Sequence, residues 1–249
     1  MGERTSYPPG THSWAELATS DADAAKGFYT QLFGWEYDDN PAGDEGQIYS
    51  MARRDGHHVA ALFKADQPPH WNCYVTVASA DETAEAAKAH GGGVMAEPFD
   101  VMDVGRMAVI TDRGGAALYL WEPRKHIGAT LVNTPGSMTW NDLATPDPEG
   151  AVDFYGKLFG WTFEEMPGIG GYRVILNGER SNGGIFPQPG SANWLPYFGH
   201  DDVDRLVGEI EGLGGQLYNG PMQLPNGRIA VLADSQGAVF AVWTGEYDD

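Results

Sequence analysis

The stretch SWAELATSDADAAKGFYTQLFGWEY at residues 13–37 returns as TWNDLATPDPEGAVDFYGKLFGWTF at residues 139–163. The two segments align without a gap at an offset of 126, and 12 of their 25 positions are identical. Solenoid repeats have periods of about 20–50 residues, so this spacing is too long for a solenoid. It indicates instead that a whole domain has been duplicated.

Each copy of the stretch predicts a strand, a helix and a second strand. WAELAT and WNDLAT alternate large and small residues, as a half-buried strand does. Asp21 and Asp147 stand where helix N-caps are expected, and Gly34 and Gly160 stand at the helix C-termini. The apolar positions behind the first cap recur at steps of three or four residues: Ala25, Phe28, Tyr29 and Leu32.

The length and the charge limit the class of protein. A chain of 249 residues has room for two domains of about 100–125 residues. The net charge of −20 argues against binding to nucleic acid or to an anionic membrane surface. A single cysteine, Cys73, excludes an internal disulfide and a cysteine-rich zinc site. There is no apolar leader or membrane-spanning run, so a cytoplasmic protein is expected.

The repeat continues beyond the opening stretch. NGRIAVLADSQGAVFAVW at 226–243 matches VGRMAVITDRGGAALYLW at 104–121, and residues 193–217 match residues 70–94. These matches divide the chain into the following parts: a flexible arm at 1–11, a first domain at 12–123 with modules 13–63 and 71–123, a linker at 124–138, and a second domain at 139–245 with modules 139–186 and 194–245.

The motifs DxxxAxxFYxxLFGW and GRxAVxxDxxGAxxxxW, each present twice, resemble the vicinal oxygen chelate superfamily. That superfamily includes glyoxalase I, bleomycin-resistance proteins and extradiol dioxygenases, and a double-domain actinobacterial subgroup looks nearest. The resemblance implies an α+β fold of four βαβββ modules in two tandem glyoxalase-like domains. Paired modules would form clefts, and the first module could pair with either the second or the fourth.

Enzymes of this superfamily hold a divalent metal in the cleft, and the resemblance implies where its ligands would lie. The first-strand ligand would precede the helix-capping Asp by seven residues, and the last-strand ligand would follow the Gly of the DxxG turn by four. The matching positions are Trp14, Tyr74, Trp140 and Tyr197 on first strands, and Tyr119 and Ala241 on last strands. The other candidate positions are Ala60, Ala61, Gly184 and Ile185. None is an ordinary ligand, so we expect no metal and no cofactor.

Aromatic residues take the place of metal ligands. The predicted ligand-binding residues are Trp14, Tyr74, Tyr119, Trp121, Trp140, Tyr197 and Trp243, together with His58 and His200 as candidates for exposure in a cleft. Such rings suit a flat, apolar or partly cationic ligand. The alternative for the rings is that they only fill clefts that have closed. For each of the seven histidines, a surface or loop position is the favoured interpretation.

Two carboxylates lie on the predicted cleft face. Strand alternation places Glu16 beside Trp14 and Asp142 beside Trp140. Each is a candidate general base or ligand anchor, and the alternative is a structural hydrogen bond to a neighbouring strand or to Arg106 or Arg228.

Two functions follow from these residues. The first is a metal-free protein that holds a small aromatic or hydrophobic molecule, for drug sequestration and resistance or for secondary metabolism. The second is an enzyme of the same fold, a lyase, isomerase, hydroxylase or cyclase, that uses a carboxylate base or a displaced metal. A regulatory protein with vestigial clefts is a third hypothesis. Because the duplication supplies a pseudo-dimer, a monomer is expected, with a homodimer as the alternative.

Overall fold

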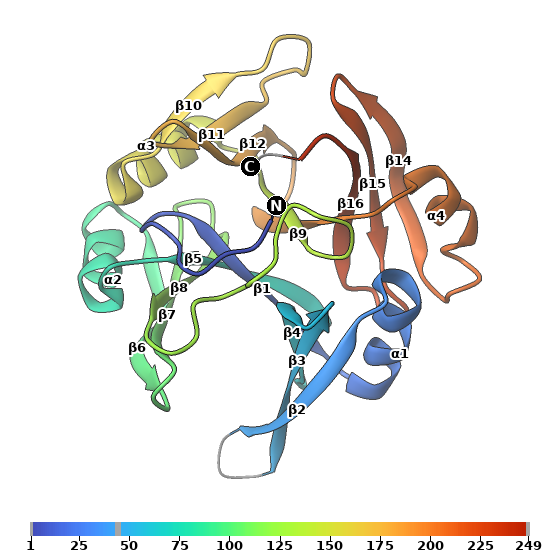
Figure 1. Cartoon of the computed structure of the whole chain (residues 1–249). Coiled ribbons are helices and arrows are strands. Elements are labelled where there is room, and N and C mark those ends of the chain that lie inside the picture. Colours follow the sequence, from blue (N-terminus) through green and yellow to red (C-terminus); the bar gives the residue numbers. More distant parts are fainter. Residues whose placement is uncertain (1, 43–45, 248–249) are drawn as a thin grey trace.

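Two eight-stranded sheets form the molecule (Figure 1). The computed structural model describes residues 2–42 and 46–247. The first sheet has the order β2 (Glu36–Ala42), β3 (Gln47–Arg54), β4 (His57–Lys64), β1 (His12–Thr19), β5 (His70–Thr76), β8 (Ala117–Pro123), β7 (Gly105–Thr111) and β6 (Gly93–Val101). The second has the order β10 (Thr162–Glu165), β11 (Arg173–Asn177), β12 (Arg180–Pro187), β9 (Met138–Thr145), β13 (Asn193–Gly199), β16 (Val239–Gly245), β15 (Gly227–Ala233) and β14 (Gln216–Leu224).

Each sheet is built from two βαβββ modules that are adjacent in sequence. The helices are α1 (Ala22–Phe33), α2 (Ala80–Ala89), α3 (Pro148–Phe159) and α4 (Val203–Glu209). Antiparallel pairing of β1 with β5 joins the first two modules, and pairing of β9 with β13 joins the last two. The predicted α+β fold of tandem glyoxalase-like modules is therefore confirmed, and the sheets pair the modules in sequential order.

The repeated helices begin and end where the sequence predicts. The side chains of Asp21 and Asp147 accept hydrogen bonds from backbone N–H groups of the first helical turn, at 3.0 Å in both cases. Gly34 and Gly160 end α1 and α3 in the left-handed conformation, with φ of 69° and 72°. These caps fix the angle at which each helix returns to its sheet.

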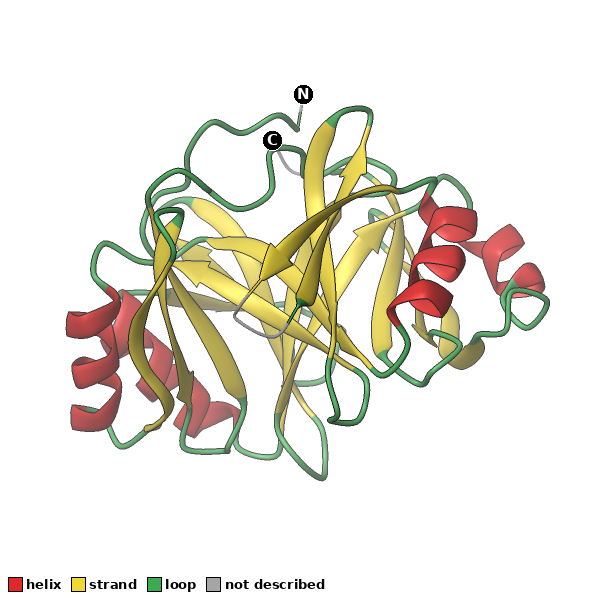
Figure 2. Ribbon diagram, turned by 90° about the horizontal axis from the view of Figure 1, so that it is seen from below, coloured by secondary structure: helices red, strands yellow, loops and turns green. Residues whose placement is uncertain are grey.

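The helices pack across the two halves (Figures 1 and 2). Helix α1 lies beside α4, and α2 lies beside α3, with the sheets between the two helix pairs. One hydrophobic core joins Phe28 and Tyr29 of α1 to Phe198 and Phe240 of the second sheet. The other core joins α2 and strands of the first sheet to α3. The first module thus pairs with the second through the sheet and with the fourth through the core.

Two buried hydrogen-bond chains cross between the halves in the same way. The indole of Trp71 donates to the hydroxyl of Tyr29 at 3.1 Å, and this hydroxyl donates to Asp234 at 3.0 Å. The same chain recurs as Trp194 to Tyr155 to Asp112, at 3.0 and 3.2 Å. Asp112 and Asp234 also cap the hairpin turns that follow them.

The N-terminal segment differs from the flexible arm that we expected. The carbonyl of Gly10 accepts a hydrogen bond from the indole of Trp161 at 2.8 Å, and the carbonyl of Gly136 accepts the equivalent bond from Trp35 at 2.7 Å. Asn177 donates to the carbonyl of Pro9 at 3.0 Å. The repeat thus extends back to the Pro-Gly pairs at 9–10 and 135–136, which anchor the chain before β1 and β9. The end of the N-terminal segment is thus held in place, because Gly10 supplies the acceptor for one buried indole.

Among the described residues, no helix is long and apolar enough to cross a membrane.

Candidate ligand-binding site

The central strands bring together the positions that the resemblance matched to metal ligands. In the first sheet, Trp14 pairs with Tyr74, which pairs with Tyr119. In the second sheet, Trp140 pairs with Tyr197, which pairs with Ala241. Indole, phenol and methyl groups are not the imidazole and carboxylate donors that hold a divalent ion. Within residues 2–42 and 46–247, no group of three or more His, Cys, Asp or Glu side chains could hold a metal. The residues present therefore do not fit the metal that the fold family implies.

A buried carboxylate occupies the floor of the second cleft. Asp142 is 3% exposed and accepts three hydrogen bonds. Its Oδ1 receives the indole N–H of Trp140 at 2.9 Å and the hydroxyl of Tyr172 at 2.8 Å, and its Oδ2 receives the hydroxyl of Tyr197 at 2.6 Å. The indole of Trp140 is shared, since it also donates to Tyr172 at 2.9 Å.

The first cleft contains an equivalent cluster around Glu16. Its Oε1 accepts from the hydroxyl of Tyr74 at 2.8 Å and from the amide of Asn72 at 3.2 Å. Its Oε2 accepts from the hydroxyl of Tyr49 at 2.9 Å, and Tyr49 in turn accepts from the indole of Trp14 at 3.1 Å. Each half thus has one carboxylate, two tyrosines and one tryptophan around the positions that the resemblance matched to metal ligands.

Burial controls the protonation of both clusters. It raises the pKa of Glu16 and of Asp142, because a charged carboxylate loses its water, and the three donors around each one only partly oppose this shift. Burial also raises the pKa of Tyr197, and the charge of Asp142 raises it further. The tyrosine hydroxyls therefore remain protonated donors at neutral pH.

The repeated arginines do not serve these carboxylates. Arg106 pairs with Asp81, and Arg228 pairs with Asp204, each at 2.6 Å. Both are ion pairs with carboxylates outside the two clusters. The buried carboxylates bond neighbouring strands instead.

One large cavity, about 1220 Å³ in volume, lies in the second half and reaches the first. The predicted residues that line it are Tyr119, Trp140, Asp142, Tyr197 and Trp243. The lining also includes residues that the sequence did not suggest: Met166, Ile169 and Tyr172 near the β10–β11 turn, and Tyr218 and Met222 on β14. The glycines at 168, 170 and 171 mark a tight loop between these strands. Nothing in their spacing shows that it folds over the cleft.

The first cleft is arranged differently from the second. The imidazole of His126 packs edge-on against Trp14, with ring centroids 4.8 Å apart, and against Trp121 at 5.8 Å. Trp14 is consequently 3% and Trp121 6% exposed, whereas their counterparts Trp140 and Trp243 are only half-buried. Neither Trp14, Trp121, Tyr74 nor Glu16 lines the 1220 Å³ cavity.

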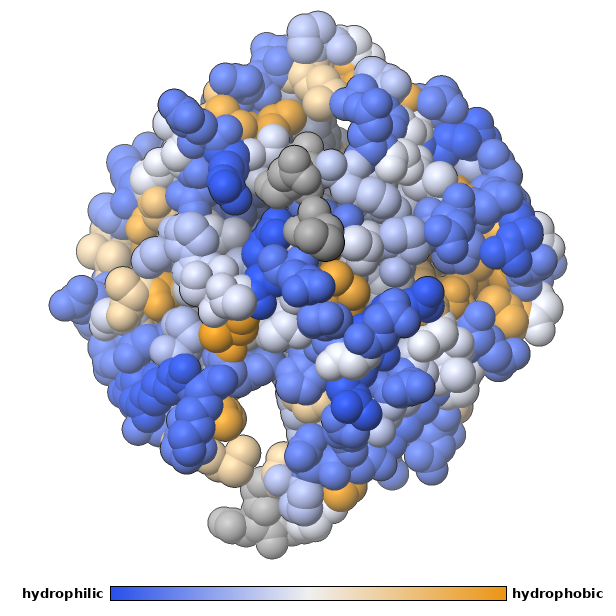
Figure 3. All heavy atoms as spheres, in the orientation of Figure 1, coloured by the Kyte–Doolittle hydropathy of each residue, from blue (hydrophilic) through white to orange (hydrophobic). Residues whose placement is uncertain are grey.

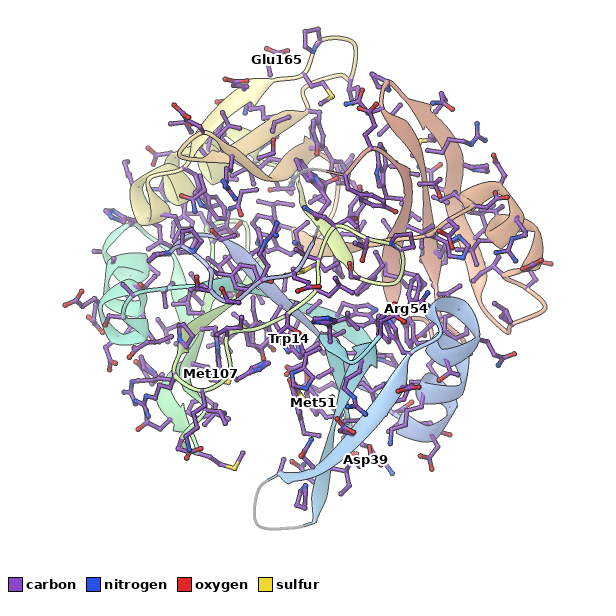
Figure 4. All side chains as sticks on the ribbon, viewed as in Figure 1. Trp14, Asp39, Met51, Arg54, Met107 and Glu165 are labelled. Atoms are coloured by element: carbon purple, nitrogen blue, oxygen red, sulfur yellow. The ribbon has the colours of Figure 1, made fainter. Side chains whose placement is uncertain are left out.

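A hollow nevertheless opens in the first half between the β2–β3 and β6–β7 arms (Figure 3). Met51, Met107 and Trp14 lie around this opening (Figure 4). Its walls are thus formed by flexible thioethers and by a ring that His126 already covers.

The candidate histidines lie away from the cavity. His58 is half-buried beside His126, with ring centroids 6.1 Å apart, and His200 accepts a hydrogen bond from the backbone of Asp202 at 3.0 Å. Neither lines the cavity.

The expectation that every histidine is a surface or loop residue is wrong. His12 lies in β1 and is 6% exposed between Trp161 and Trp194, and burial lowers its pKa to about 3. His200 is also buried. His12 is buried because β1 begins earlier than predicted, at His12 itself, and enters the core between the halves.

With the fold and the clefts described, the class of protein is clear. The family model described as the Glyoxalase/Bleomycin resistance protein/Dioxygenase superfamily matches residues 12–120, and the chain belongs to that superfamily. Among its relatives, the Mycobacterium tuberculosis protein CFP32, provisionally designated a glyoxylase, is 44% identical over 254 residues, which cover 97% of each chain. The anthracycline biosynthesis protein DauV of Streptomyces sp. strain C5 is 31% identical over 273 residues, which cover 96% of this chain and 94% of that protein.

Solved structures share the fold. The Mn(II)-bound glyoxalase from Novosphingobium aromaticivorans superimposes with a TM-score of 0.69 at 17% identity, covering 96% of this chain and 84% of that one. The 2,3-dioxygenase LapB from Pseudomonas sp. KL28 gives 0.68 at 13% identity, covering 96% and 94%. At these identities the likeness concerns the fold alone.

Proposed function

We propose that this protein binds a flat, polycyclic aromatic small molecule in the second-half cavity without using a metal. The observation that carries this proposal is a cavity of about 1220 Å³ that Trp140, Tyr197 and Trp243 line together with one buried carboxylate, Asp142. Such a site combines large apolar ring faces with a few polar groups that fix the orientation of a ligand. The volume is ample for a ligand of several fused rings.

The relatives support the same chemical class. DauV and DnrV are named as anthracycline biosynthesis proteins, and anthracyclines are polycyclic aromatic compounds. The binding would serve secondary metabolism, or sequestration of such a compound as a means of resistance.

Fluorescence titration with the anthracycline doxorubicin tests the proposal. We expect saturable quenching of the tryptophan emission with one site per chain, since Trp140 and Trp243 border the cavity. Trp140→Ala should weaken binding by about tenfold or more, since a stacked aromatic contact contributes about 0.5–1.5 kcal/mol beyond its buried area.

Trp14→Ala is the matched control, because Trp14 occupies the equivalent position in the first half and does not line the cavity. It should retain the wild-type affinity, provided that circular dichroism shows a folded protein. The absence of saturable binding by a broad panel of polycyclic aromatics would refute the proposal.

An enzyme is the second candidate function, and Asp142 is the observation that favours it. Burial raises its pKa, it borders the cavity, and two tyrosine hydroxyls hold it in place. A carboxylate in this state suits proton transfer to or from a bound aromatic substrate. Asp142→Asn should then abolish turnover of a bound compound while leaving its affinity measurable.

A further inference from the structure

The charged side chains of the cavity indicate the charge of the ligand as well as its flat shape. Among the described residues that line it, none is Lys or Arg, and the acidic ones are Asp142 and Glu246. Asp142 is on the floor, and Glu246 is exposed. His70 is the one imidazole in this lining, and its Nδ1 is 2.7 Å from the carbonyl of Pro68. The described lining therefore offers no Lys or Arg to neutralise an anionic ligand.

Asp142 keeps room for one more donor. A carboxylate offers about four acceptor sites on its two oxygens. Trp140 and Tyr172 occupy two sites on Oδ1, whereas Tyr197 occupies one on Oδ2. One acceptor site therefore remains on Oδ2, and Asp142 is among the residues that line the cavity.

Building on the proposed function, we propose that the ligand is a cationic polycyclic aromatic amine whose N–H group donates to Oδ2 of Asp142. A charge-assisted hydrogen bond of this kind is about twice as strong as a neutral one. The faces of Trp140, Tyr197 and Trp243 stabilise a delocalised cation that lies against them. The net charge of −20 adds a long-range attraction that salt weakens, whereas the contact at Asp142 is buried and less screened.

The same arrangement disfavours an anion. An anionic group next to Asp142 would meet a second negative charge in a poorly solvated space, and no Lys or Arg of the described lining would compensate it. The site therefore selects by charge as well as by shape, and a neutral aromatic compound of the same size should bind with intermediate affinity.

Three acridine probes of one shape separate these effects: acridone, which is neutral, 9-aminoacridine, which is cationic at neutral pH, and acridine-9-carboxylate, which is anionic. Equilibrium dialysis at pH 7.5 in 0.5 M NaCl measures each dissociation constant with long-range attraction screened. We expect 9-aminoacridine to bind at least about tenfold more tightly than acridone, and acridine-9-carboxylate at least about tenfold more weakly. Asp142→Asn should abolish the advantage of the cation and leave acridone binding largely unchanged.

Glu82→Gln is the charge-matched control, since it removes one negative charge from the exposed face of α2, outside the cavity lining. It should leave all three affinities unchanged. If acridone and 9-aminoacridine bind equally well, the charge selection is wrong while the proposed function stands. If the preference survives in Asp142→Asn, Asp142 does not bind the cation and the inference is overturned. If none of the three probes binds, both proposals fail together.

Discussion

At the scale of single residues, the buried polar groups give rise to testable effects on stability, pH dependence and ligand affinity. His12 is enclosed by Trp161 and Trp194, and its two ring nitrogens have no hydrogen-bond partner among the described residues. The cost of protonating it there explains why its pKa falls to about 3. In the second half, Met138 stands at the equivalent position, which shows that an apolar side chain fits this place in the core.

His12→Met should make the protein more resistant to acid. The folded state keeps His12 neutral down to about pH 3, while the unfolded chain binds a proton below about pH 6.5. In that window the unfolded state binds more protons, so the stability from this group is complete above pH 6.5 and is lost as the pH falls. At pH 5 the loss is about 2 kcal/mol. Urea unfolding at pH 7 and at pH 5 measures how much the free energy of unfolding falls between the two pH values. This fall should be smaller in His12→Met than in the wild type by about 2 kcal/mol. An equal fall in both proteins would contradict a neutral, buried His12.

Tyr172→Phe and Tyr49→Phe form a matched pair in the two carboxylate clusters. Each tyrosine donates to a buried carboxylate and accepts from an indole. Each variant should lose about 1–2 kcal/mol of unfolding free energy, since each loses two hydrogen bonds. Only Tyr172→Phe should change the affinity for an aromatic probe, because only Tyr172 lines the cavity. Thermal unfolding and fluorescence titration check the two effects separately, and a binding defect in Tyr49→Phe would place the ligand elsewhere.

At the scale of elements, the helix termini position the strands that form the clefts. α1 and α3 share an N-cap Asp and a left-handed C-terminal Gly, so both repeats turn into the next strand at the same angle. The surroundings of the two glycines differ, however. A Cβ added to Gly34 would lie 2.7 Å from Nη1 of Arg54, which bonds the carbonyl of Phe33, whereas a Cβ added to Gly160 would meet no atom within 4 Å.

Gly34→Ala should therefore cost more stability than Gly160→Ala. Both substitutions force alanine into the left-handed region, at about 1–2 kcal/mol each. Gly34→Ala must also displace the guanidinium of Arg54 from the end of α1. Chemical denaturation of the two variants measures the difference, and equal losses would show that Arg54 moves away at no cost.

At the scale of the whole molecule, sheets and cores pair the modules differently. The sheets join modules that are adjacent in sequence, while the hydrophobic cores join the first module to the fourth and the second to the third. The chains from Trp71 to Asp234 and from Trp194 to Asp112 cross the same interface. Both of the larger cores need residues from both halves, and only a small cluster around Leu195 and Tyr197 lies within the second half alone, so the two halves should fold as one unit.

Separate expression of residues 1–124 and 125–249 tests this mutual dependence. Each half alone would expose the face of its helices that the other half covers, and should therefore aggregate or self-associate. Co-expression should give a soluble one-to-one complex, as analytical ultracentrifugation can show. A monomeric half that unfolds cooperatively would contradict the shared cores.

The sequence by itself determined the four modules. Strand alternation, helix caps and terminating glycines depend only on nearby residues, so their duplicated pattern can be recognised in the sequence. It also predicted, through the family resemblance, that Trp14, Tyr119, Trp140 and Tyr197 stand at the positions of metal donors, since each position could be counted from a repeated motif. The carboxylates Glu16 and Asp142 were found from strand alternation alone.

Only the tertiary structure decided which cleft contains the large cavity and what surrounds it. Tyr172 reaches Asp142 from a loop 30 positions away, and His126 covers Trp14 from the linker. The cores shared between halves, and with them the burial of His12, depend on how surfaces far apart in the chain meet. Side-chain packing between distant segments depends on three-dimensional shape, which neither periodicity nor spacing along the chain encodes.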